Sequence, residues 1–224
     1  MTAITNTSNS RTAGILLIAG SILMIFAMLH HPTGHEHEFS EFIEEVQAFQ
    51  LLNALVHGGA IGLLLIFVLG FSFLSDRLGW NRLDVRLAVI FYVLGGAAMV
   101  VAAMISGFIV PFFLDRYSEA SAAELQFAES MLTLLREVNR AFDQLGVIGM
   151  SVGVFFWSTA MIYRERQKWI GGGLGIAVGV LGVAGVFTGH LEASVPVIIS
   201  FVLLHGTWNF CIGLKLLRPA AEKS

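Results

Sequence analysis

Hydrophobic residues in this chain come in six long runs, and the short stretches between them hold most of the charged residues. As a helix, a run of about 20 apolar residues is long enough to cross the roughly 30 Å hydrocarbon layer of a membrane. The pattern therefore predicts six transmembrane helices in a single membrane domain, residues 1–224. The runs lie near residues 13–29, 50–74, 87–113, 142–163, 170–189 and 195–217.

Composition agrees with this pattern. Hydrophobic residues make up 56% of the chain and charged residues only 13%, too few to cover a soluble domain of this length. The net charge of -3, without a basic cluster, argues against nucleic acid as a partner. The one cysteine, Cys211, lies inside a predicted span, which leaves no intramolecular disulfide and no Cys-rich metal site. We expect an all-α integral membrane protein surrounded by the lipid bilayer.

Lysine and arginine are divided unequally between the two sides of the membrane. By the positive-inside rule, the richer side is cytoplasmic, which places both termini in the cytoplasm. The compact chain has no evident organelle-targeting segment, so we expect a multi-pass protein of a bacterial inner membrane. The richer side holds Arg11, Arg77, Arg82, Arg86, Arg164, Arg166, Lys168, Lys215, Arg218 and Lys223, and the other side Arg116, Arg136 and Arg140.

Two of the outward loops show helical patterns. From Ser40, which we take as an N-cap, acidic residues in the first turn indicate a helix. In the second outward loop, Ser121 and Glu124 have the spacing of a capping box. Apolar residues then recur at helical spacing, which predicts a short amphipathic helix on or near the outer surface. These residues are Leu125, Ala128, Leu132, Leu135 and Val138.

Glycines recur every four residues in two of the spans. Gly171, Gly175 and Gly179 do so in the fifth, and Gly58 and Gly62 in the second. Such spacing lets helix backbones approach closely, within one bundle or between two copies of a homo-oligomer. The alternative is a groove for a flat cofactor or a lipid tail.

The three spans that run inward from the outer side carry polar residues three or four positions apart, which places each set on one helical face. Polar side chains at membrane depth are costly and usually face a bundle interior, where they mark functional sites. If the three faces converge, they form a polar pocket open to the outside. In the structural alternative, each side chain only bonds a neighbouring helix. The sets are Gln50, Asn53 and His57; Arg136, Asn139 and Asp143; His205 and Asn209.

A metal ion is the ligand that these residues favour. Two histidines and a carboxylate can hold zinc or copper and leave a coordination position open. The expected ligands are His57, Asp143 and His205, with His190 as a fourth. By residue counting, His57 should lie roughly 8–10 Å below the outer boundary and His205 nearer the middle. Asn53, Asn139 and Asn209 would orient the ligands or hold a substrate. Whether the protein catalyses a reaction stays open.

The first outward loop adds a second metal hypothesis. It holds four histidines interleaved with glutamate, which could capture a metal loosely and pass it inward. Pro32 and Gly34 indicate a turn, so a solvated loop is the alternative. The four histidines are His30, His31, His35 and His37.

Three other functions fit the same residues. His57 and His205 could be the axial ligands of a b-type haem in an electron-transfer or quinone-linked protein. Together with Asp143, they could instead relay protons or ions in a transporter. In the third alternative, the chain is a non-catalytic accessory or sensor subunit that docks a membrane partner through its outward face.

Overall fold

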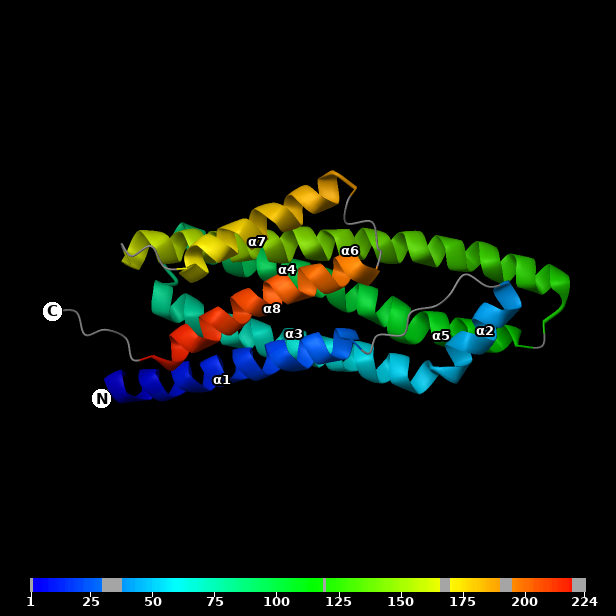
Figure 1. The fold of residues 1–224 in the computed structure, drawn as a ribbon, viewed down its shortest axis with the longest axis horizontal. Helices are drawn as coiled ribbons and strands as arrows, with labels where there is room; N and C mark the ends of the chain where they lie inside the picture. The colour runs from blue at the N-terminus through cyan, green and yellow to red at the C-terminus, as the bar shows by residue number, and fades with distance from the viewer. Residues whose placement is uncertain (1, 30–37, 119, 166–169, 190–194, 219–224) are drawn as a thin grey trace.

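The computed structural model describes residues 2–29, 38–118, 120–165, 170–189 and 195–218, and these ranges consist of helices joined by short turns, with no strand. Figure 1 shows an elongated bundle whose long helices follow its long axis. In chain order the elements are α1 (Thr2–Leu29), α2 (Phe39–Ala48), α3 (Gln50–Leu78), α4 (Leu83–Met104), the π-helical turn η1 (Ile105–Ile109), α5 (Val110–Leu114), the 3-10 turn η2 (Asp115–Tyr117), α6 (Ala122–Glu165), α7 (Ile170–Phe187) and α8 (Val195–Leu217).

Five described helices are long and apolar enough to cross a membrane, which confirms the prediction of an all-α, membrane-type bundle. The apolar helix at the predicted fifth span is shorter, Gly171–Phe187. The count of six spans and the direction of insertion therefore stay predictions. The five long segments are Asn9–Leu29, Gln50–Leu78, Leu83–Tyr117, Ala122–Tyr163 and Ile199–Leu217.

The predicted outer amphipathic helix is not a separate element. It forms the first part of α6, which continues through the fourth apolar run for 44 residues, about 66 Å. No proline interrupts this stretch and its first glycine is Gly146, so nothing ends the helix where a break was expected. At its start, the Glu124 carboxylate accepts hydrogen bonds from the Ser121 N–H at 2.8 Å and the Ser121 hydroxyl at 2.6 Å, as half of a capping box.

The prediction for the start of α2 was off by two positions. Glu38, not Ser40, is the residue that precedes the helix, and no side chain caps it. Ser40 lies in the first turn. The buried Ile43 holds the helix against the bundle, and the guanidinium carbon of Arg136 on α6 lies 5.1 Å from the centre of the Phe42 ring.

The two ends of the bundle differ. We call the end where α1 begins and α8 finishes the basal end, and the end with α2, α5 and the start of α6 the distal end (Figure 1). Helices α3, α6 and α8 run from distal to basal. Among the helix pairs, α4 and α7 both pack on α6, while α1 packs on α8 and α3.

Glycines allow the closest helix contacts. A Cβ added at Gly95 of α4 would lie 2.5 Å from the backbone nitrogen of Met150 on α6, and one at Gly149 would lie 2.6 Å from the Cα of Gly95. On α7, a Cβ at Gly179 would lie 2.7 Å from the Phe155 Cβ on α6. The packing interpretation thus holds for α7. It does not hold for Gly62 of α3, because nothing lies within 4 Å of a Cβ there.

Four aromatic rings from four helices form the centre of the bundle. The Phe71 ring of α3 lies 4.9 Å from Tyr92 of α4, 4.7 Å from Trp157 of α6 and 5.3 Å from Trp208 of α8, measured between ring centres. All four side chains are at most 1% exposed. The Trp157 indole N–H donates to the Ser75 hydroxyl at 2.9 Å. We call these rings the aromatic cluster, and they fix one common level along α3, α4, α6 and α8.

Candidate functional site

The aromatic cluster shows how far along the bundle each expected ligand lies. His57 precedes Phe71 by 14 residues and Asp143 precedes Trp157 by 14 residues, so both lie about 21 Å toward the distal end. His205 precedes Trp208 by three residues, or about 4.5 Å. His57 and Asp143 therefore share one level, and His205 lies about 16 Å nearer the basal end.

Because of this separation, the expected ligands His57, Asp143 and His205 do not all lie at one level of the bundle. Two ring nitrogens bound to one zinc ion each lie about 2.0–2.1 Å from it, and two haem ligands face each other across one iron at similar range. By this residue count, His57 and His205 do not lie that close. Within the described ranges, no three His, Cys, Asp or Glu side chains gather as a metal cluster. The other expected ligands, His190 and the loop histidines His30, His31, His35 and His37, lie outside the described residues.

At the distal level, His57 packs against the π-helical turn. The side chain is 8% exposed, and its Nδ1 lies 2.9 Å from the Asn53 carbonyl oxygen. A carbonyl can only accept, so Nδ1 carries the proton in this bond and the lone pair of the neutral ring is on Nε2. A Cβ at Gly107 of η1 would overlap the His57 side chain, so glycine is what lets the ring lie flat on the turn.

The Asn53 side chain supplies a hydrogen bond that the backbone of the π-helical turn lacks. The Val110 N–H donates to the Ile105 carbonyl, five residues back. The next bond in this register would run from residue 111 to Ser106, but Pro111 has no N–H. The Asn53 side-chain amide donates to the Ser106 carbonyl instead, at 2.8 Å. The polar residue Asn53 thus has a structural role beside any functional one.

On α6, Asp143 is held by its own helix. The Asn139 side-chain amide donates to the Asp143 carboxylate at 3.2 Å. The Asn139 amide oxygen is buried and has no hydrogen-bond partner among the described groups. Asn139 and Asp143 therefore carry acceptor oxygens at the same distal level as His57.

Deeper in the bundle, His205 and Asn209 lie one helical turn apart on α8. Their exposed fractions are only 5% and 3%. Neither ring nitrogen of His205, nor the side-chain oxygen of Asn209, has a hydrogen-bond partner in the part of the chain that the structure describes. A buried polar group without a partner costs roughly 1–3 kcal/mol, and water does not reach the hydrocarbon core to relieve it. These two side chains are therefore the strongest candidates for contact with a bound ligand.

A third polar group lies close to them. The Phe201 ring centre is 4.1 Å from that of His205. A Cβ at Gly182 of α7 would lie 3.3 Å from the Phe201 ring and would overlap the Ser151 hydroxyl of α6. Ser151 is fully buried, and its hydroxyl also lacks a partner among the described residues. Ser151 of α6 and His205 of α8 thus both lie near the Phe201 ring, beside α7 and just distal to the aromatic cluster.

Sequence reasoning found His205 and Asn209 but missed the aromatic cluster, whose Trp208 lies between them on α8, and the π-helical turn. Pro111 inside an apolar run was the available signal for the turn, since proline removes a helix hydrogen bond. Comparison with known proteins adds no assignment: no family model, curated protein or solved structure matches the chain.

Proposed function

We propose that the protein binds a divalent metal ion inside the bundle, with His205 as its principal ligand. The observation that carries this proposal is the buried His205 ring, whose two nitrogens have no partner among the described residues. Neutral imidazole is a common ligand of zinc and copper. One ring nitrogen would bind the ion, and the other could donate its proton to an acceptor, as metal-bound histidines usually do.

Asn209 suits the supporting role. It lies four residues after His205 on the same face of α8, and its side-chain oxygen is an acceptor without a donor in the described structure. His190 remains a further candidate ligand. The ion would enter the bundle from the distal side, past His57 and Asp143 and the nearby Asn53 and Asn139. These four side chains would line that path rather than bind the ion.

The proposed orientation follows the charge distribution. Both termini would face the cytoplasm, so that the distal end and its polar level face outward. A bacterial inner membrane is the expected setting. An ion would then reach His205 from the outer side, and the aromatic cluster would separate it from the cytoplasm.

The test is the metal content of the detergent-purified protein after loading with zinc or copper. We expect about one ion per chain in the wild type, loss of most of it in His205→Ala, and retention in the control His57→Ala. Thermal unfolding of each variant without metal shows whether the bundle is intact. Equal metal in the wild type and a folded His205→Ala would contradict the proposal.

A proton relay is the second candidate, and buried hydroxyls favour it. Ser151 lies distal to the aromatic cluster, Tyr92 belongs to it and Ser158 directly follows Trp157; all three are buried, and their hydroxyls have no partners in the described ranges. With His205 they form a series of polar groups that could carry protons. Proton flux into liposomes that is lost in His205→Ala, from protein that binds no metal, would favour this function over the first.

A further inference from the structure

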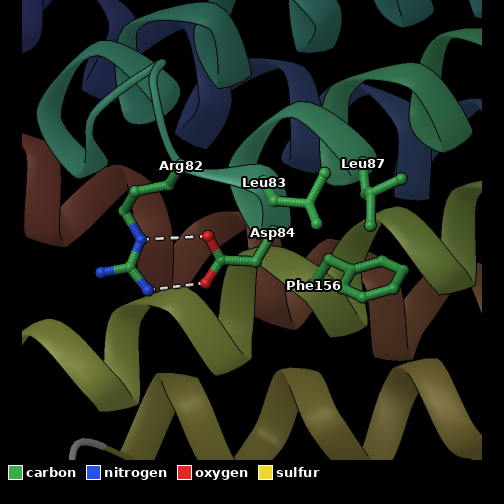
Figure 2. A pocket seen from close by; sticks show the side chains of 5 residues that line it. All are labelled: Arg82, Leu83, Asp84, Leu87 and Phe156. Atoms are coloured by element: carbon green, nitrogen blue, oxygen red, sulfur yellow. Dashed lines mark hydrogen bonds and ion pairs between the residues drawn. The ribbon is translucent and has the colours of Figure 1, made fainter.

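A shallow groove of about 450 Å³ lies on the surface near the basal end. It runs between the start of α4 and the side of α6, and Figure 2 shows its lining side chains. Three of these side chains are apolar, and two carry opposite charges. The lining residues are Arg82, Leu83, Asp84, Leu87 and Phe156.

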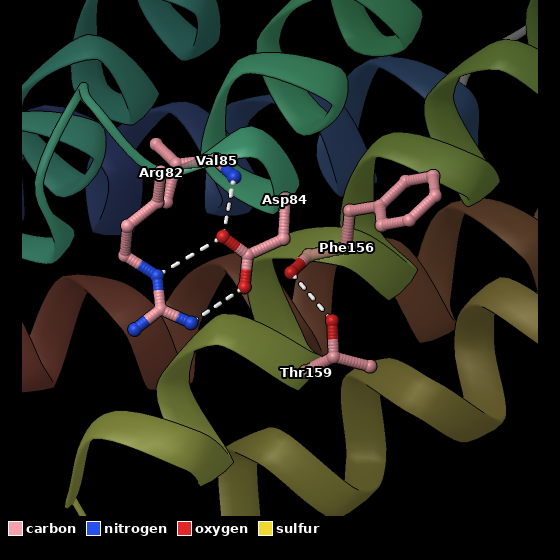
Figure 3. Close-up of polar contacts among 5 residues, drawn as sticks. All are labelled: Arg82, Asp84, Val85, Phe156 and Thr159. Atoms are coloured by element: carbon pink, nitrogen blue, oxygen red, sulfur yellow. Dashed lines mark hydrogen bonds and ion pairs between the residues drawn. The ribbon is translucent and has the colours of Figure 1, made fainter.

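The two charged side chains are fixed against each other. The Arg82 Nε donates to Asp84 Oδ1 at 3.0 Å, and its Nη2 donates to Oδ2 at 2.6 Å. Asp84 Oδ1 also accepts the Val85 N–H at 3.0 Å, which anchors the carboxylate at the first turn of α4 (Figure 3). The pKa of Arg82 lies above its ordinary value, chiefly because of the hydrogen bond to Asp84. The groove thus presents a fixed positive and a fixed negative charge side by side.

Both charges remain accessible. Their side chains are 37% and 24% exposed, and the third guanidinium nitrogen of Arg82 points away from Asp84 (Figure 2). The groove also lies where an apolar helix begins. Leu83 is 72% exposed, and Trp80, of a type common at membrane interfaces, is 40% exposed. This is the level at which a lipid headgroup meets its acyl chains.

We propose that the groove binds a zwitterionic phospholipid with an ethanolamine headgroup. Its phosphate would accept hydrogen bonds from Arg82, and its ammonium group would donate to Asp84. One acyl chain would lie along Leu83, Leu87 and Phe156. A phosphatidylglycerol headgroup carries the same phosphate but no ammonium group for Asp84, and a choline headgroup has no N–H to donate.

The test is native mass spectrometry of the full chain, purified in detergent and offered equal amounts of phosphatidylethanolamine, phosphatidylglycerol and phosphatidylcholine. We expect the ethanolamine lipid to be retained about two- to fivefold more than either competitor, the size of an exposed charge contact. In Asp84→Asn, which can still accept the Val85 N–H, the preference should shift to phosphatidylglycerol. In Arg82→Gln, the preference for the ethanolamine lipid should disappear.

Arg86→Gln is the matched control, because Arg86 lies on the same turn but does not line the groove and donates to the Trp80 carbonyl instead. It should retain the wild-type preference. Equal retention of the three lipids by the wild type, or an unchanged preference in a folded Asp84→Asn, would overturn the proposal.

Discussion

At the scale of single residues, Asn53 illustrates how a polar group in a membrane helix can be explained without a ligand. Its amide supplies the hydrogen bond that Pro111 cannot make, and so holds the π-helical turn against α3. His205 differs, because no described group satisfies its ring nitrogens. Both residues stood out in the sequence because each is a polar side chain inside an apolar span. Only the groups around them in the structure distinguish the structural role of Asn53 from the candidate ligand His205.

Asn53→Ala should lower the free energy of unfolding by about 0.5–1.5 kcal/mol, because the Ser106 carbonyl loses the hydrogen bond that the Asn53 amide donates. The measurement is reversible unfolding in mixed micelles. Asn81→Ala is the control: Asn81 is exposed, and its oxygen lies 3.5 Å from Arg86, so its loss should leave stability almost unchanged. Equal stability of the two variants would mean that the amide does not hold the turn.

At the scale of elements, the length of the apolar runs predicted the helices well. All six runs coincide with described helices, because a backbone in lipid must satisfy its hydrogen bonds within the helix. Residue counting within the runs already predicted that His205 lies deeper than His57. The size of the offset between them was not predictable in the same way. It depends on which residues meet across the helices, and the Phe71–Trp208 contact sets the offset of about 16 Å between His57 and His205.

Gly95 and Gly96 are neighbouring glycines of α4, and of the two only Gly95 lies close against another helix. Gly95→Ala should destabilise the bundle by about 1–3 kcal/mol, because its Cβ would collide with the α6 backbone at Met150. Gly96→Ala should be neutral or slightly stabilising, since nothing lies within 4 Å of a Cβ there and alanine favours the helix. Unfolding of both variants checks this, and a loss of stability in Gly96→Ala as large as in Gly95→Ala would contradict the described α4–α6 contact.

At the scale of the whole molecule, the bundle has two chemically different ends. Basic side chains gather at the basal end, where Arg77 of α3 donates to the Lys215 carbonyl of α8 at 3.1 Å. The distal end holds the projecting start of α6 and the polar level of His57 and Asp143. This asymmetry supports insertion with the basal end in the cytoplasm.

Cysteine labelling tests that orientation. In a Cys211→Ser background, Ser121→Cys at the distal end should react with a membrane-impermeant maleimide in intact cells. Asn81→Cys at the basal end should react only after the membrane is opened. The reverse labelling pattern would contradict the proposed orientation. The path of the ion to His205 would then start on the cytoplasmic side.

The most direct test of the proposed function is anomalous diffraction at the zinc edge from crystals of the zinc-loaded protein. We predict a single strong peak about 2.0–2.1 Å from a ring nitrogen of His205, within the region bounded by α6, α7 and α8. A peak beside His57 or in the first outward loop, or no peak near His205 in a fully loaded crystal, would contradict the assignment of His205 as the principal ligand.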